Sequence, residues 1–329
     1  MPRERKQNAH QVFDSMHRRK TSPKPNTKTM VVSQRNWLDL PDDVTSNILN
    51  RLGVIEILEN AQKVCTAWRK ICKDPVMWRV INMENLQDSA THSALKKMCM
   101  NAIDRSQGQL VHLNIEHFPT DDLIQFLAQG ERSSQLRRLQ ISDCNSLLHK
   151  SWSDFFKKTP LLEEIALTFT AISEETVAEI SRYCPMLKSF TYNNYGWEHS
   201  MAMNSADDFV ITVAKGMSQL LHLQLTGNEM SNKGLQAILD SCPNLQSLDL
   251  RGCFRINLNE SCGKLCKERI KNIRLPSDSV EDHKVAPIED PYADYVWDDY
   301  VGLYDKLSDD DDYGGFGSFT DFYIDYYTL

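Results

Sequence analysis

One short pattern recurs along this chain at a nearly constant interval, and it restricts the possible folds more than any other feature. In residues 245–253, LQSLDLRGC, apolar side chains occupy the first, fourth and sixth positions. Seven copies begin at positions 110, 136, 162, 187, 220, 245 and 270, with steps of 26, 26, 25, 33, 25 and 25 residues. A chain with this period must be built from equivalent structural units.

The spacing inside each copy explains why the units must stack. Alternation over Leu248, Asp249 and Leu250 marks a short strand with one buried face, and apolar residues between the copies show helical spacing. One unit has about six core side chains worth roughly 2 kcal/mol each, while ordering it costs on the order of 1.5 kcal/mol per residue. Neighbouring units must therefore share a core. The pattern is typical of leucine-rich repeats, and it predicts an α/β fold, a right-handed solenoid (horseshoe) of about seven repeats over residues 84–280.

Composition narrows the class of protein further. No run approaches roughly 18 apolar residues and the first residues lack an apolar core, so we expect neither a membrane span nor a secretory signal. The nine cysteines are scattered without paired spacing. This distribution favours a reducing compartment, the cytoplasm or the nucleus.

Charge is concentrated in two segments outside the repeats. Residues 1–36 hold nine Lys and Arg against two acids, whereas residues 289–329 hold twelve acids against one Lys. The second segment also has eight of the eleven tyrosines. We predict that the basic segment 1–36 and the acidic, aromatic segment 281–329 are disordered. The acidic segment could instead dock on a basic partner or on the sheet of this same chain.

Residues 37–83 form a different kind of unit, rich in apolar residues at helical spacing. One stripe consists of Val44, Ile48, Leu49 and Leu52. A second stripe extends over residues 61–72. An all-α unit of about forty residues is too short to bury so much apolar surface alone. The surplus must pack on the repeats or on a partner chain.

This unit resembles an F-box. The resemblance rests on an ordered set of motifs: Leu40-Pro41, the Ile48-Leu49/Leu52 run, Val64-Cys65, Trp68-Arg69, and Asp74-Pro75 followed by Trp78. With repeats after it, the chain resembles plant-type F-box/leucine-rich-repeat proteins of the Skp-interacting partner 19 group. The resemblance extends from residue 37 to about residue 276.

The resemblance implies a role as the substrate-recognition subunit of an SCF-type E3 ubiquitin ligase. In such proteins the F-box binds a Skp-family adaptor, which a cullin holds, and the repeats bind the target protein for ubiquitination. The adaptor-binding residues implied by position are Leu40, Pro41, Val44, Ile48, Val64 and Trp68. Trp68 has an equally strong second interpretation, a buried structural indole. The alternative function is a leucine-rich-repeat scaffold that binds its partner outside a ligase.

Strand alternation sends three residues of each repeat to the side of the sheet away from the core. These residues are polar and mixed in charge without a basic stripe, which argues against nucleic acid as a partner. The 33-residue step adds about eight residues near positions 193–205, a loop with large apolar side chains. The predicted target-binding residues are Tyr195, Trp197, Gln224, Asp249 and Arg251. The loop could equally fold back over its own repeat.

Catalysis and metal binding are not indicated. The sequence contains no G-x-S-x-G or H-E-x-x-H motif and no phosphate-binding glycine loop. Cys262 and Cys266 with His283 could suggest metal ligands, yet both cysteines also fit a helix face that packs inward. Cys144 and Cys253 follow their strands at the position where such repeats place a structural Asn or Cys. We therefore expect no catalytic residue, no metal and no cofactor, with a Cys-dependent enzyme as the remaining alternative.

Overall fold

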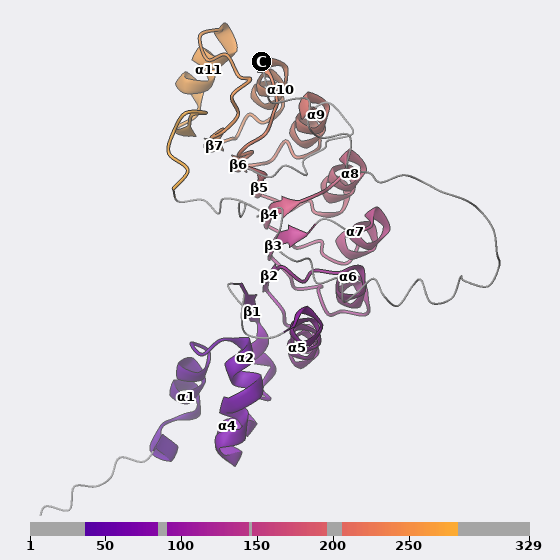
Figure 1. The fold of residues 1–329 in the computed structure, drawn as a ribbon, viewed down its shortest axis with the longest axis vertical. Helices are drawn as coiled ribbons and strands as arrows, with labels where there is room; N and C mark the ends of the chain where they lie inside the picture. The colour runs from indigo at the N-terminus through magenta and orange to yellow at the C-terminus, as the bar shows by residue number, and fades with distance from the viewer. Residues whose placement is uncertain (1–36, 85–90, 145–146, 196–205, 282–329) are drawn as a thin grey trace, which may run out of the picture.

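The structure is a computed structural model and describes residues 37–84, 91–144, 147–195 and 206–281. It consists of a helical unit followed by a row of alternating strands and helices (Figure 1). The predictions of disorder for residues 1–36 and for the acidic segment lie outside the described residues, apart from residue 281. No helix in the described ranges is both long enough and apolar enough to cross a membrane.

The helical unit is made of short segments. They are η1 (Trp37–Asp39), α1 (Asp42–Leu49), α2 (Val54–Glu56), the π-helical turn η2 (Ile57–Ala61), α3 (Gln62–Val64), α4 (Thr66–Ile71) and η3 (Pro75–Trp78). Asp42 and Asp43 lie in the first turn of α1, where the helix dipole favours acids. The second predicted stripe is divided between two helices, because Cys65 is extended, with φ −157° and ψ 170°. Its Sγ accepts the backbone N–H of Trp68 at 3.5 Å and thereby caps α4.

Eight parallel strands pair in chain order in an open sheet. They are β1 (Val80–Met83), β2 (His112–Glu116), β3 (Arg138–Cys144), β4 (Glu164–Thr170), β5 (Ser189–Asn193), β6 (His222–Gln224), β7 (Ser247–Asp249) and β8 (Asn272–Arg274). The fourth position of the repeated pattern is in register across the sheet. This row is Ile81, Leu113, Leu139, Ile165, Phe190, Leu223, Leu248 and Ile273. The register confirms that the seven copies are equivalent units and adds β1, which precedes them.

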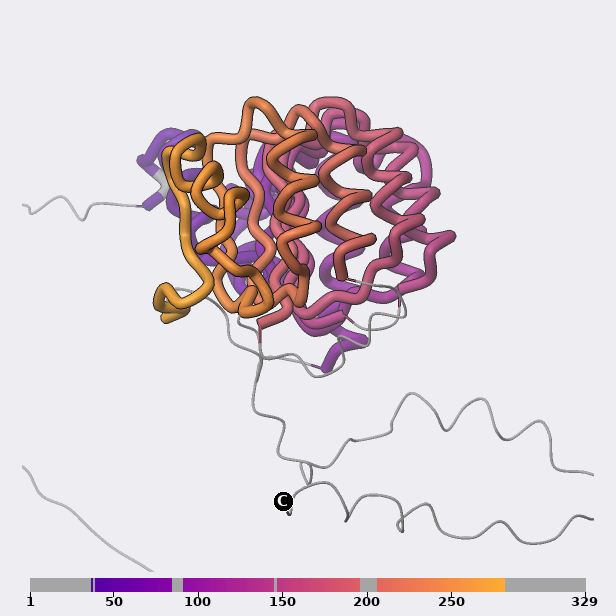
Figure 2. The backbone as a smooth tube through the Cα atoms, turned by 90° about the horizontal axis from the view of Figure 1, so that it is seen from above, coloured from indigo at the N-terminus to yellow at the C-terminus, as the bar shows by residue number. Residues whose placement is uncertain are grey.

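The helices lie on one side of this sheet (Figures 1 and 2). They are α5 (His92–Arg105), α6 (Asp121–Ala128), α7 (His149–Phe156), α8 (Glu174–Tyr183), α9 (Ala206–Gly216), α10 (Asn232–Ser241) and α11 (Ser261–Arg269). Each packs on the helix before it. The other side of the sheet, called here the helix-free face, carries the polar rows that alternation predicts. The insertion lies between the end of β5 and the start of α9, where the 33-residue step places it.

One side chain connects the helical unit to the solenoid. Arg105, at the end of α5, donates from Nη2 to Gln62 Oε1 at 3.1 Å and from Nη1 to the Cys72 carbonyl at 3.4 Å. The same guanidinium lies 5.3 Å from the ring centroid of Trp78. That indole is buried and donates to the Cys72 carbonyl at 3.0 Å. The first helix of the solenoid is therefore fixed to two segments of the helical unit.

Arg105→Ala should lower the free energy of unfolding by about 2 kcal/mol, because charged hydrogen bonds contribute about 1.5–3 kcal/mol and cation–π contacts about 0.5–1 kcal/mol. Arg132→Ala is the matched control: Arg132 also stacks on a ring, that of Phe126 at 4.0 Å, and pairs with Asp104 at 2.9 Å, but within the solenoid. That exposed pair and its ring contact should together contribute about 1 kcal/mol. Urea unfolding measures the free energy of unfolding of both variants. An equal decrease in the two variants would contradict the role of Arg105 in joining the helical unit to the solenoid.

Candidate functional site

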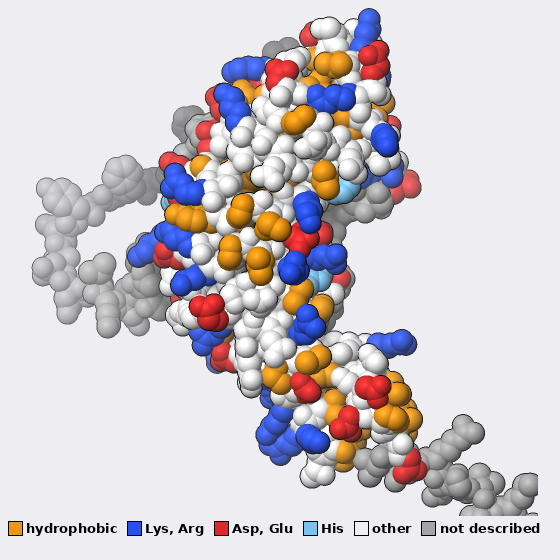
Figure 3. Space-filling model, turned by 180° about the vertical axis from the view of Figure 1, so that it is seen from behind, with side chains coloured by type: hydrophobic (Ala, Val, Ile, Leu, Met, Phe, Trp, Pro, Cys, Tyr) orange, Lys and Arg blue, Asp and Glu red, His pale blue; other side chains and the backbone are white. Residues whose placement is uncertain are grey.

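The helical unit exposes apolar side chains on α1 and α3. Val44 is 39% exposed, Ile48 36% and Val64 63%. Val44 and Ile48 are four residues apart, so they lie on one face of α1, while Thr45 and Leu49 bury the opposite face. Figure 3 shows hydrophobic side chains gathered on the free side of this unit. Because α1 has apolar residues on both faces, one apolar face remains exposed.

Two tryptophans lie beside this surface. Trp68 on α4 is half-buried against the core, and its ring meets that of Trp37 edge-on, with centroids 6.3 Å apart and planes at 83°. Trp37 is 59% exposed. Leu40 and Pro41 lie between Trp37 and α1 in the sequence, and Leu40 is half-buried while Pro41 is exposed. Trp68 is thus a structural indole that is not fully buried, and its contact with an adaptor stays a prediction. The sequence analysis did not single out Trp37 as a site residue.

The helix-free face is polar and hydrogen-bonded from strand to strand. Asn114 Nδ2 donates to Asn82 Oδ1 at 3.0 Å and to Glu84 Oε2 at 2.9 Å. His117 Nδ1 lies 2.6 Å from Asp143 Oδ2. Carboxylates therefore gather at the carboxyl ends of β1 to β3.

A cluster of ion pairs lies at the amino ends of β3, β4 and β5. Glu163 there binds both Arg137 and Lys188. These hydrogen bonds, first that from Lys188 and then that from Arg137, lower the pKa of the Glu163 carboxyl. Among the described residues of these strands, carboxylates and cations are therefore interspersed.

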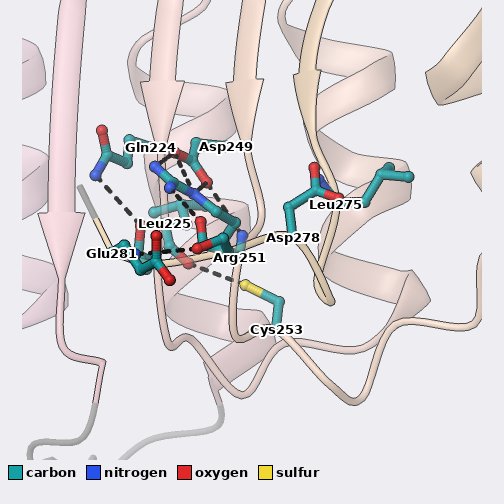
Figure 4. Close-up of polar contacts among 10 residues, drawn as sticks. Gln224, Leu225, Asp249, Arg251, Cys253, Leu275, Asp278 and Glu281 are labelled. Carbon is teal, nitrogen blue, oxygen red and sulfur yellow. Dashed lines mark hydrogen bonds and ion pairs between the residues drawn. The ribbon is translucent and has the colours of Figure 1, made fainter. Parts of the chain in front are cut away.

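The structure corrects the expectation for Arg251, which alternation placed in the solvated row. Arg251 is 2% exposed and donates from Nη2 to Asp249 Oδ2 at 2.7 Å and from Nε to Asp249 Oδ1 at 3.0 Å (Figure 4). Its Nη1 donates to the Ser279 carbonyl at 2.7 Å. Asp249 is also buried. The physical reason is the chain after β8, which returns to β7 and covers the guanidinium.

Two further predicted target-binding residues, Gln224 and Tyr195, differ in what they contact. Gln224 is half-buried and donates from Nε2 to Thr226 Oγ1 at 3.2 Å. Tyr195 packs on two glycines in the left-handed region, Gly227 at φ +72° and Gly252 at φ +75°. A Cβ on Gly252 would lie 2.5 Å from the Tyr195 ring, and one on Gly227 would lie 2.5 Å from its Cα. The start of the loop therefore folds onto the following repeats, while Trp197 lies outside the described residues.

The cysteine thiols are mostly buried inside the fold. Eight of the nine cysteines are buried and Cys65 is partly exposed. Burial raises the pKa of the Cys99, Cys184 and Cys253 thiols to about 12. Cys253 Sγ donates to the Leu225 carbonyl at 2.9 Å, the loop-bonding role that its position predicts.

Two of the three candidate metal ligands lie on α11. Cys262 and Cys266 are buried on α11, as the inward-facing interpretation predicts, while His283 lies outside the described residues. Within those residues no group of three or more His, Cys, Asp or Glu side chains could hold a metal ion.

Comparison with known proteins gives matches for both units. The F-box-like family matches residues 37–84, and the family described as Leucine Rich repeat matches residues 217–239. The chain is 42% identical over 299 residues to the F-box protein SKIP19 of Arabidopsis thaliana, covering 90% of this chain and 94% of that protein. It is 45% identical over 246 residues to F-box/LRR-repeat protein 23 of Arabidopsis thaliana, covering 74% of this chain and 54% of that protein. This match spans about half the length of the second relative.

Among solved structures, one similar chain comes from the crystal structure of the Rad7 and Elc1 complex in yeast. The TM-score is 0.37 at 14% sequence identity, and the match covers 66% of this chain and 63% of that chain.

Arg251→Ala should lower the free energy of unfolding by about 3–5 kcal/mol, because it removes the guanidinium that is paired with the buried Asp249 carboxylate. Arg138→Ala is the control on the same face, since Arg138 pairs with Glu164 at 3.4 Å and is 62% exposed. Its loss should cost about 1 kcal/mol or less. Thermal unfolding of both variants gives the comparison. Native stability together with lost target capture in Arg251→Ala would restore the original interpretation of Arg251 as a contact residue.

Alkylation of the native chain by iodoacetamide at pH 8 should modify Cys65 roughly tenfold or more faster than Cys99, Cys184 or Cys253. The reason is that the reactive form is the thiolate, which burial disfavours at the last three positions. Peptide mass spectrometry over time measures each rate. A second thiol as reactive as Cys65 would instead support the Cys-dependent enzyme.

Proposed function

The chain belongs to the F-box/leucine-rich-repeat family, and we propose that it is the substrate-recognition subunit of an SCF-type E3 ubiquitin ligase. Its F-box binds a Skp-family adaptor and, through it, a cullin. Its repeats bind the protein to be ubiquitinated. The observation that carries this proposal is the exposed apolar surface of Val44, Ile48 and Val64 on the matched F-box segment.

The adaptor surface has the chemistry of a protein interface core. It presents branched aliphatic side chains from two helices, with the exposed Pro41 and Trp37 near its start. The buried core of a protein interface is more apolar than its polar rim, which fits these side chains. The opposite side of α1 packs into the unit through Leu49, so binding leaves the fold unchanged.

The target surface is the helix-free face of the sheet together with the insertion after β5. Gln224 and the strand-to-strand row of polar residues offer hydrogen bonds to a bound segment. Tyr195 and Trp197 remain proposed contacts. Asp249 and Arg251 are buried, so they do not contact the target directly. Their role in target binding is to hold the chain at the β7 end of the helix-free face in place.

Recruitment is the whole activity in this proposal, and the chain supplies no catalytic residue. The raised pKa values of the buried thiols and the structural role of Cys253 favour it over a Cys-dependent enzyme. A repeat scaffold acting outside a ligase would use the same sheet face but would bind no cullin. Unpaired cysteine spacing favours the cytoplasm or the nucleus as the site of action.

Val64→Asp should weaken capture of a purified Skp-family adaptor on the order of 30-fold or more, because it places a carboxylate in an apolar interface. Leu148→Asp is the matched control: Leu148 is 61% exposed, as Val64 is 63%, but it precedes α7 in the solenoid. Both variants should unfold at the native midpoint. Biolayer interferometry with the adaptor measures the affinities.

Equal adaptor affinity of native chain, Val64→Asp and Leu148→Asp would contradict the assignment of this surface. Reconstitution with adaptor and cullin then separates the two functions. Co-elution of all three chains is expected from a substrate receptor. Elution without the cullin would favour the scaffold.

A further inference from the structure

The row of helices ends at α11 with one side open. Each helix from α6 to α10 has a neighbour on both sides, whereas the described part of the chain places nothing beyond α11 except loop (Figure 1). The sheet ends in the same way, since β8 pairs with β7 alone. End units of a solenoid expose core surface unless another element covers them.

The open end is basic. Lys264, Leu265 and Lys267 project from the exposed side of α11, and β8 adds Ile273 and Arg274, with Lys271 before it. We call these six residues the terminal surface. Residues 254–281 hold six Lys and Arg against four acids, so the described part of this end has a net positive charge. None of the terminal-surface cations forms an ion pair within the described ranges. Figure 3 shows Lys, Arg and hydrophobic side chains at this end of the molecule, with some Asp and Glu among them.

The inner side of α11 is already occupied. Arg269 Nη2 donates to the Cys242 carbonyl at 2.6 Å, and its Nη1 donates to the Leu239 carbonyl. Cys262 and Cys266 are buried toward α10. The remaining lysines are therefore not used in holding α11 to the stack.

The chain that continues from this end has the complementary chemistry. Residues 289–329 carry twelve acids and one Lys. Between positions 292 and 307, apolar residues recur three and four positions apart. They are Tyr292, Tyr295, Val296, Tyr300, Leu303, Tyr304 and Leu307, while Trp297 and Val301 lie outside this spacing. This is the spacing of an amphipathic helix, the kind of element that a solenoid places beside its last helix.

Length and position allow this segment to reach the terminal surface. Ser279 is held at the end of the sheet by the Arg251 guanidinium. Tyr292 follows the last described residue, Glu281, by eleven residues. Eleven residues span up to about 36 Å, whereas neighbouring helices lie about 8–10 Å apart.

We propose that residues 292–307 dock on the terminal surface and cap the solenoid. Their apolar residues contact Leu265 and Ile273, and their carboxylates lie beside the unpaired cations of α11 and β8. The composition of the segment alone predicts disorder, and only the structure places a basic, partly apolar surface next to its start. The cap requires neither an adaptor nor a target, so it is independent of the ligase role.

Hydrogen exchange on the full chain tests the cap. Tyr300→Ala with Leu303→Ala should raise amide exchange in peptides from Ser261–Arg269 roughly tenfold, because the docked segment no longer restrains local opening. Phe322→Ala with Tyr323→Ala is the matched control, an aromatic pair outside the spaced stretch, and should leave this exchange unchanged. Equal exchange in native chain and both variants would overturn the proposal.

Carbodiimide cross-linking gives a second readout, since it joins carboxylates to lysines in direct contact. In the full chain, acids of residues 292–307 should couple to Lys264, Lys267 and Lys271 about tenfold more than to the exposed Lys63 and Lys73 of the F-box. The yield should fall in 1 M salt as screening increases. Dominant coupling to the F-box lysines would overturn the cap. In a mixture of isotopically labelled and unlabelled chains, cross-links mainly between the two kinds of chain would also overturn the cap, because the contact would then be between molecules. Adaptor affinity, measured on the same sample, reports separately on the proposed function.

Discussion

Every strand of this protein buries its apolar side chains only because the neighbouring repeats extend the same core. The row from Ile81 to Ile273 is continuous across eight strands, and each of its members is held in register by the strand beside it. A parallel sheet of this kind has no local hairpins, so its stability comes from contacts between repeats. The two ends are then the weak points. The helical unit covers one of them, through Trp78 and Arg105.

The sequence predicts the repeated part of the fold well because the repeat period also gives the register of the strands. Residues at the same position of the pattern pair with each other across the sheet. Leucines at fixed spacing define both the strand and the face that it buries. The helical unit was harder to predict, since an apolar stripe over residues 61–72 reads as one helix. The break at Cys65 depends on a thiol that accepts a backbone N–H, which spacing does not reveal. Arg105 also required the structure, because its partner Gln62 is 43 residues away.

For the candidate site, alternation identifies which side chains leave the core but not what covers them afterwards. Arg251 has the outward position that the pattern predicts, yet the chain near Ser279 returns over it. Tyr195 similarly lies on Gly227 and Gly252, a platform formed by later repeats. On the F-box the exposed Val44, Ile48 and Val64 agree with the expected open surface. Their binding of an adaptor, like the whole assignment of contact residues, stays a prediction, as does the horseshoe shape.

Because Arg105 fixes the helical unit to the first helix of the solenoid, the number of a strand corresponds to its distance from the helical unit. The helical unit packs beside β1 and α5, and the strands follow in chain order from that point (Figure 1). Neighbouring strands are about 4.8 Å apart, so β8 lies about 34 Å along the sheet from β1. Position along the sheet is therefore equivalent to distance from the F-box. A protein held near the insertion after β5 would stand about 20 Å farther out than one held at β1. Adding or deleting one repeat would change that reach by a single strand spacing.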